Sequence, residues 1–219
     1  MLRTSIVRGD LLPGSMHSVG SLAEMLGVSR TPVREALIEL ASHGMVRFER
    51  NRGVRIVETS IHDLEEIFEI RRLLEPYGAR IAFERMTRET LARLKGVMAD
   101  QQVAQAEGDE ERLWNLDRAF HHALLLASGN QRLADYVDHL RDMVIVRDPG
   151  RLQTTSNESG VAVGHATILQ ALEEGDGAAV EAAVLAHVDH TFGMLVDQER
   201  DFHRRQDPSR LSGDGQRRL

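Results

Sequence analysis

The amino-acid sequence predicts a mainly α-helical protein built of two parts. Apolar residues recur at helical spacing along most of the 219 residues. They alternate with charged residues, as in a strand, only between about residues 46 and 56. We therefore expect short helices and one β-hairpin in residues 1–58, an all-α bundle of about six helices in residues 59–205, and a disordered tail in residues 206–219.

The first part, called the head below, is expected to begin with three short helices. Their predicted positions are about residues 2–8, residues 21–26 and a segment that starts at Ser29. The hydroxyl of Ser29 can accept a backbone N–H bond and cap the third helix.

A β-hairpin is expected directly after the third helix. In VRFERNRGVRIV, apolar residues alternate with charged ones on both sides of Asn51-Arg52-Gly53, a sequence typical of a turn. A helix, a turn, a second helix and a hairpin with a basic tip together predict a winged helix-turn-helix.

The second part, called the body below, is expected to be helical throughout. Breaks that contain glycine separate six helical patterns, and Pro76 lies where it would split or kink the first of them. The expected helices cover residues 61–85, 88–106, 110–128, 131–147, 160–174 and 177–203.

The third helix of the head presents two arginines to the outside. Arg30 and Arg34 are one turn apart and Thr31 shares their arc, whereas the buried stripe lies on another arc. A helix fits the major groove of DNA, where an arginine can bond guanine at two atoms. Phosphates can accept hydrogen bonds from Thr31 and from Arg52 at the hairpin tip. The alternative is a solvated helix whose arginines pair with neighbouring glutamates.

The charge of the chain is unevenly distributed. Residues 1–55 hold eight arginines and five acidic residues, a net charge of +3, whereas the whole chain carries −7 and the remainder therefore −10. A basic head on an acidic body suggests an anionic partner at the N-terminal end. The chain has no cysteine, and no apolar run approaches the roughly 20 residues of a membrane span. We expect a cytoplasmic protein that does not bind membranes.

Four polar residues of the body occupy positions that the helical period assigns to the core. Asp117 and His121 are one turn apart in one predicted helix, and His165 and His187 lie in two others. A buried histidine is often satisfied by hydrogen bonds alone. One carboxylate oxygen and three imidazoles also suit a divalent transition metal: zinc, nickel, manganese or iron. The residues by themselves leave both interpretations open.

Two arginines also fall on inward positions. Arg71 lies one turn before Glu75 in the first helix of the body, and the simplest interpretation is that the two pair with each other. The functional interpretation is that Arg71 binds the carboxylate of a small effector near the metal. Arg141 is a second, weaker candidate for that role.

The segment LAEMLGVSRTPVREALIELASHGMVRFERNRGVRIV closely resembles the DNA-binding domain of GntR-type bacterial transcription regulators. The resemblance implies that Arg30, Thr31 and Arg34 face DNA, with Arg52 and Gly53 at the wing. It also implies a homodimer on a near-palindromic operator, in keeping with the few base pairs that one helix can read. The sequence departs from the family at Gly20, where a basic residue often adds a DNA contact.

The helical remainder resembles the effector domain called FCD, found in the FadR-like branch of that family. The segments that carry the resemblance are LDRAFHHALLLASGN, GHATILQALEEGD and AAVLAHVDH. It implies that Asp117, His121, His165 and His187 hold a metal ion, with zinc expected in the purified protein, and that a small carboxylate completes the coordination. An acidic residue usually precedes the third ligand, where this chain has Gly164.

These features favour a DNA-binding transcription regulator, expected to be a repressor, that responds to a small carboxylate. A regulator whose signal is the metal itself is an alternative. A metal-dependent hydrolase is the alternative from another class, but the chain has no His-Glu-x-x-His run and no nucleophile motif. We therefore predict that the protein is not an enzyme.

Overall fold

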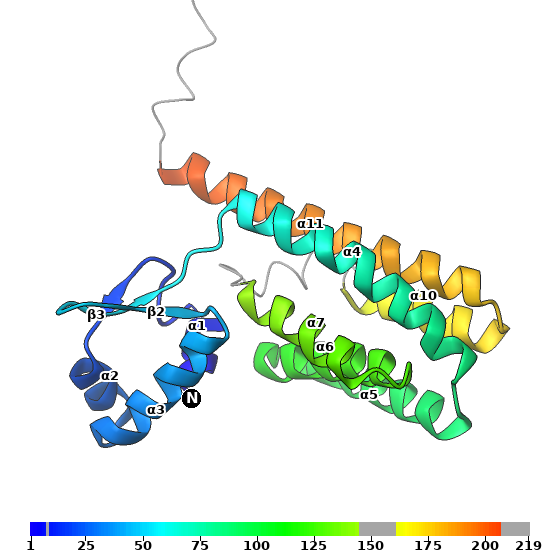
Figure 1. Ribbon diagram of the computed structural model, residues 1–219, viewed down its shortest axis with the longest axis horizontal. Coiled ribbons are helices and arrows are strands. Elements are labelled where there is room, and N and C mark those ends of the chain that lie inside the picture. Colours follow the sequence, from blue (N-terminus) through cyan, green and yellow to red (C-terminus); the bar gives the residue numbers. More distant parts are fainter. Residues whose placement is uncertain (8, 145–160, 207–219) are drawn as a thin grey trace, which may run out of the picture.

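The computed structural model describes residues 1–7, 9–144 and 161–206 of the chain. Figure 1 shows two parts, with the head on the left and the helical body on the right. The elements of the head are α1 (Leu2–Val7), β1 (Met16–His17), α2 (Val19–Leu26), α3 (Arg30–Ser42), β2 (Val46–Glu49) and β3 (Gly53–Ile56). Those of the body are α4 (Ile61–Glu84), α5 (Arg88–Glu107), α6 (Glu110–Leu126), α7 (Gln131–Met143), α10 (Val161–Glu174) and α11 (Gly177–Gln206).

The sheet of the head has three strands rather than the predicted two. Its antiparallel order is β1-β3-β2, and Met16 pairs with Arg55 in the added contact. The sequence prediction missed β1 because two residues are too few to show alternation. The close approach of β1 also requires the glycine at the start of β3. A Cβ on Gly53, whose φ is +115°, would lie 2.2 Å from the carbonyl oxygen of His17.

Two helix starts in the head differ from the prediction. Helix α2 begins at Val19 rather than near residue 21, because Ser18 caps it in a box with Ser21: each side chain bonds the other residue's backbone N–H. Ser29 does occupy the capping position of α3, but its side chain makes no capping hydrogen bond, so that expectation was wrong.

The core of the head is apolar. The buried side chains of the helices, the sheet and the segments between them form one cluster of Leu2, Ile6, Leu11, Leu22, Ala23, Val33, Leu37, Leu40, Met45, Val46, Val54 and Ile56. Packing the inner face of α3 against this cluster leaves its other face at the surface of the molecule.

The body is a bundle in which α4 lies along α11, with α5, α6 and α7 beneath them in Figure 1. Helix α4 runs through Pro76 without a break. Helix α7 ends at Met143, whereas the prediction extended it to residue 147, and residues 145–147 lie outside the described part of the chain. Helix α11 continues to Gln206, three residues beyond the prediction. Gln206, the first residue of the expected disordered tail, is therefore helical, and residues 207–219 lie outside the described residues.

Helix α11 is long and apolar enough to cross a membrane by length and composition, over Gly177–Asp201. Its apolar residues nevertheless have partners inside the protein: Val180, Val184 and Val188 are fully buried in the body's core with residues of the other helices. The helix therefore serves as a core element of the bundle.

Candidate metal centre and nucleic-acid interface

The four inward polar residues of the body meet at one point in the structure. Asp117 and His121 extend from α6, His165 from α10 and His187 from α11, and all four are buried. One ligand atom from each residue can be chosen such that all of these atoms lie within 4.8 Å of one another. The core thus encloses a cluster of one carboxylate and three imidazoles, called the Asp-His cluster below.

The spacing of the ligand atoms matches the first coordination shell of a metal ion. The Nε2 atom of His121 lies 3.1 Å from Nε2 of His165 and 3.1 Å from Nε2 of His187. Asp117 Oδ1 lies 3.4 Å from Nε2 of His165 and 3.9 Å from Nε2 of His121. Ligands about 2.1 Å from a zinc ion are separated by about 3.0 Å at right angles and about 3.4 Å in a tetrahedron.

The outer nitrogens of two histidines face acceptors. His121 Nδ1 lies 3.2 Å from Oε2 of Glu75 on α4, and His165 Nδ1 lies 3.0 Å from Oε1 of Gln101 on α5. A carboxylate and an amide oxygen both favour a proton on Nδ1. The two Nε2 atoms then carry lone pairs that face each other at 3.1 Å without a proton between them. A cation at the centre relieves this repulsion, so the donor set fits a metal ion.

The third histidine is placed by a glycine rather than by a hydrogen bond. His187 Nδ1 is buried without a hydrogen-bond partner. A Cβ on Gly164 of α10 would lie only 2.1 Å from that nitrogen. The glycine therefore makes room for the imidazole of His187, at the position where similar effector domains usually have an acidic residue.

Burial keeps the cluster in the charge state that binds metal. It lowers the pKa of His121 to about 4, and the nearby Arg141 cation adds to this effect. Burial and the two neighbouring imidazoles also hold the pKa of His187 well below its usual value. Burial alone would raise the pKa of Asp117, but Arg141 and the histidines bring it well below the usual range. At neutral pH the imidazoles of His121 and His187 are therefore neutral and the carboxylate of Asp117 is ionised, the forms that bind metal.

Both arginines of the predicted effector site lie beside this cluster. Arg71 Nε donates to Glu75 Oε1 at 2.5 Å, so the predicted pair exists. Arg141 of α7 donates to Asp117 Oδ2, the oxygen that does not face the histidines. One further nitrogen of each guanidinium, Nη2 of Arg71 and Nη1 of Arg141, is buried without a hydrogen-bond partner. Nη1 of Arg141 lies 3.8 Å from Oε2 of Glu75, which is too far for a hydrogen bond. Both nitrogens can therefore still donate a hydrogen bond to an anion.

The sequence prediction missed one residue of the site and found only one of the two contacts of another. Gln101 was not singled out, although it lies seven residues after Leu94 on the buried face of α5, so the helical period could have identified it. Glu75 was seen as a partner for Arg71, whereas the structure also brings it to His121. With Gln101 and Arg141, each of the six described body helices contributes a residue to the site.

The side chains predicted to contact DNA are exposed on the head. Arg30, Thr31 and Arg34 are exposed on the first turns of α3. Arg52 extends from the hairpin tip with 73% of its side chain exposed. Gly53 is the half-buried strand residue that admits β1. The guanidinium of Arg30 lies over Gly20, 3.4 Å from the place of a Cβ, and thus covers the position where the family often has a basic residue.

Comparisons with known proteins agree with this two-part construction. Residues 1–56 match the model of "Bacterial regulatory proteins, gntR family", and residues 66–190 match the model of the FCD domain. The chain belongs to the GntR family. It is a DNA-binding transcription regulator of the FCD type rather than an enzyme.

Bacterial relatives match most of the chain. The transcriptional regulator LutR of Bacillus subtilis (strain 168) is 31% identical, and the match covers 87% of this chain and 95% of LutR. The transcriptional repressor RspR of Escherichia coli (strain K12) is 29% identical over 86% of this chain and 82% of its own length. The solved structure of E. coli McbR/YncC is similar with a TM-score of 0.74 and 27% identity, over 90% of this chain and 94% of that one.

Proposed function

We propose that this GntR regulator is a repressor whose operator binding is controlled by a small carboxylate bound at a metal ion in the body. The observation that carries the proposal is the pair of buried guanidinium nitrogens without hydrogen-bond partners, on Arg71 and Arg141, beside the Asp-His cluster. Donors of this kind are costly to bury unless an acceptor is supplied. A carboxylate supplies oxygen atoms for both the metal ion and the arginines.

In this proposal Asp117, His121, His165 and His187 hold a divalent transition metal, for which zinc is the expected ion in the purified protein. When bound, the metal supplies a Lewis-acidic position for one carboxylate oxygen of the effector. Arg141 and Arg71 bind the remaining negative charge. Glu75 and Gln101 keep His121 and His165 in the tautomer that binds metal.

In the head, we assign Arg30 and Arg34 to base edges or phosphates in the major groove, and Thr31 and Arg52 to phosphates. Gly53 serves the wing by letting its backbone pass close to β1. The exposure of these four side chains supports this assignment. We expect the operator to be near-palindromic and the protein to act in the cytoplasm, where the DNA is.

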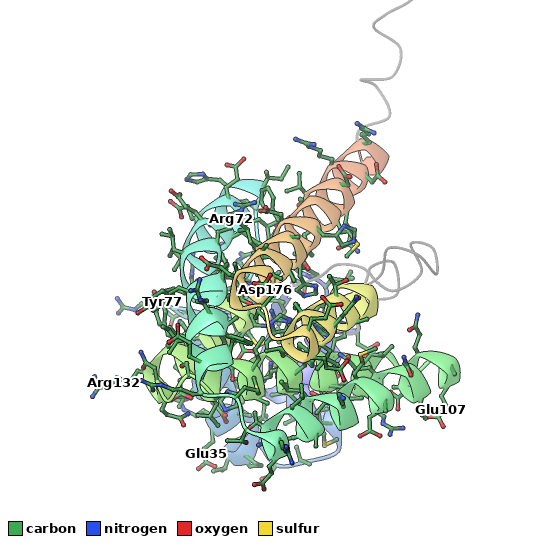
Figure 2. All side chains as sticks on the ribbon, turned by 90° about the vertical axis from the view of Figure 1, so that its right-hand side faces the viewer. Glu35, Arg72, Tyr77, Glu107, Arg132 and Asp176 are labelled. Carbon is green, nitrogen blue, oxygen red and sulfur yellow. The ribbon has the colours of Figure 1, made fainter. Side chains whose placement is uncertain are left out.

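A near-palindromic operator implies two copies of the chain. Helix α4 carries an exposed apolar stripe that suits a second copy: Leu73 is 70% exposed, Tyr77 60% and Ile70 36%. Figure 2 shows Tyr77 pointing outward from α4. Isolated exposed apolar residues are ordinary, but three at helical spacing on one face form a patch that dimerisation would bury.

Operator binding tests this proposal. DNA selected from a random library with the purified protein serves as the operator, and its affinity is measured for chelator-treated and zinc-loaded protein with acetate, succinate or citrate. The proposal predicts that a carboxylate changes the affinity by about 5- to 150-fold and that His187→Ala abolishes the response while still binding DNA. A response to zinc alone, to which no carboxylate adds, would identify the metal as the signal.

A further inference from the structure

Two neighbouring residues of α7 bind two neighbouring residues of α6. Arg141 pairs with Asp117 of the Asp-His cluster, and Asp142 accepts a hydrogen bond from Arg118. The two ion pairs are consecutive links between the same turns of the two helices. One link includes a residue of the cluster, and the other lies outside the cluster, where 32% of the Arg118 side chain is exposed.

Asp142 also binds the head. Arg3 of α1 donates a hydrogen bond to the same carboxylate oxygen that Arg118 contacts. The side chain of Asp142 is only 3% exposed, whereas that of Arg3 is 45% exposed. A nearly buried carboxylate is thus held by one guanidinium from the head and one from the body, through charge-assisted hydrogen bonds.

The same end of α7 makes further contacts with the head and with the segment that leads from it. The hydroxyl of Thr59, just before α4, donates to the carbonyl oxygen of Met143 at 3.1 Å. The rings of His43, at the end of α3, and His139 lie 6.1 Å apart between centroids. In Figure 1 this end of α7 is the end that points toward the head.

We propose that Asp142 positions the head according to what Arg141 binds, through the link Arg3–Asp142–Arg118, called the α7 clasp below. This inference rests on the proposed function, because it takes an anionic effector to be the group that draws Arg141. When the guanidinium of Arg141 turns from Asp117 toward an anion, the last turn of α7 moves with it. Asp142 is the next residue of that turn, so Arg3 and the head shift or are released.

Packed contacts of this kind have discrete alternative arrangements, so that a small shift in the body can change the position of a whole domain. The effector changes operator affinity only to the extent that it binds one arrangement better than the other. Removing Arg3 breaks the α7 clasp and leaves the Asp-His cluster unchanged. The effector should then no longer alter the affinity of the protein for the operator.

The test compares Arg3→Met with wild type, because Arg3 is half exposed and methionine keeps the aliphatic length. Operator affinity is measured for chelator-treated protein, for zinc-loaded protein, and for zinc-loaded protein with acetate, succinate or citrate. In the wild type we expect a carboxylate to change operator affinity by about 5- to 150-fold. In Arg3→Met the same carboxylate should change operator affinity by less than about twofold, and the affinity for zinc should be unchanged. Arg112→Met is the matched control, because it removes exposed ion pairs that lie wholly within the body.

Asp142→Asn is a second, independent test, because it keeps the size of the side chain but removes the charge that Arg3 and Arg118 bind. It should lose the response as Arg3→Met does. A wild-type response in both variants would overturn the α7 clasp and leave the proposed function intact. A wild type that responds neither to zinc nor to any of the carboxylates would overturn the proposed function and the clasp together.

Discussion

The head and the body both carry arginines, histidines and carboxylates. The head keeps these groups outside its apolar core, whereas the body buries some of them. Among the described residues, every buried side chain before residue 58 is apolar, and the candidate DNA contacts Arg30 and Arg34 are exposed. Buried polar and charged side chains begin at Thr59 and include the four residues of the Asp-His cluster. A polar surface suits a partner that arrives from outside, whereas a buried polar cluster requires a ligand that the fold encloses.

Because of this difference, substitutions in the head and in the body should affect different properties of the protein. An exposed arginine adds little to stability, so a change there should alter DNA binding alone. A buried histidine or glutamine is held by specific partners, so a change there should alter ligand affinity and also stability. Substitutions of Gly164, Arg34, Gln101 and His121 test that separation.

Gly164→Ala should cause the largest change, a loss of metal affinity of more than about 100-fold. The new Cβ would lie 2.1 Å from Nδ1 of His187, so the imidazole must leave its place and the ion loses a ligand. This exceeds the roughly 10- to 100-fold effect typical of removing a group outside the coordination shell. Isothermal titration with zinc measures it. Gly96→Ala is the control, because a Cβ there meets nothing within 4 Å; equal zinc affinities in the two variants would refute the placement of His187.

Arg34→Ala should weaken specific operator binding by about 1–3 kcal/mol, or roughly 5- to 150-fold, if the side chain reads a base. Zinc affinity and melting temperature should stay as in wild type, because Arg34 is exposed on the head and the Asp-His cluster is buried in the body. Gel shifts on the selected operator provide the measurement. Arg93→Ala removes an exposed arginine of α5 and should leave DNA binding unchanged; a loss as large as that of Arg34→Ala would mean that only overall charge matters.

Gln101→Leu should lower zinc affinity by about 10- to 100-fold, because His165 loses the acceptor that holds its Nδ1 proton. Leucine is close in size, so the fold should be retained. Gln102→Leu changes the exposed neighbour on the same helix and serves as the matched control. The experiment is the same zinc titration, and equal affinities for the two variants would show that Gln101 does not support the site.

The free energy of unfolding of the metal-free protein should fall as the pH drops, at pH values above those at which ordinary carboxylates are protonated. The pKa of His121 is about 4 in the folded state, below the 6.5 of a free imidazole. Between these values the unfolded state binds more protons, so stability is full above pH 6.5 and falls as the pH drops toward 4. At pH 5 this histidine alone should cost on the order of 2 kcal/mol.

Urea denaturation of chelator-treated wild type and His121→Gln at pH 7 and pH 5 measures this effect. His62→Gln, which changes an exposed histidine of α4, is the control. The His121→Gln variant should lose less stability than wild type between the two pH values. The same loss in both proteins would contradict a role for the buried imidazole.

Much of the fold could be predicted from local patterns in the sequence. The helical period placed the body helices to within a few residues and assigned Asp117, His121, His165 and His187 to inward positions, where the structure brings them together. Periodicity reports which face of a helix is buried, and that information suffices to place a side chain inside.

Local patterns could not reveal partners that are distant in the sequence. Arg3 and Asp142 are 139 residues apart, and His165 lies 64 residues from Gln101. Strand β1 has only two residues, and its pairing with β3 depends on Gly53. Such contacts are set by how the helices and strands pack, so they became visible only in three dimensions.

The metal content of the purified protein shows whether the Asp-His cluster is a metal site. Native mass spectrometry after incubation with zinc, nickel or manganese, followed by removal of free ions, should find one ion per chain in wild type and none in His187→Ala. A wild type that carries no ion under any of these conditions would contradict the account. The four buried residues would then be a hydrogen-bonded core cluster, and the proposed effector site would have no basis.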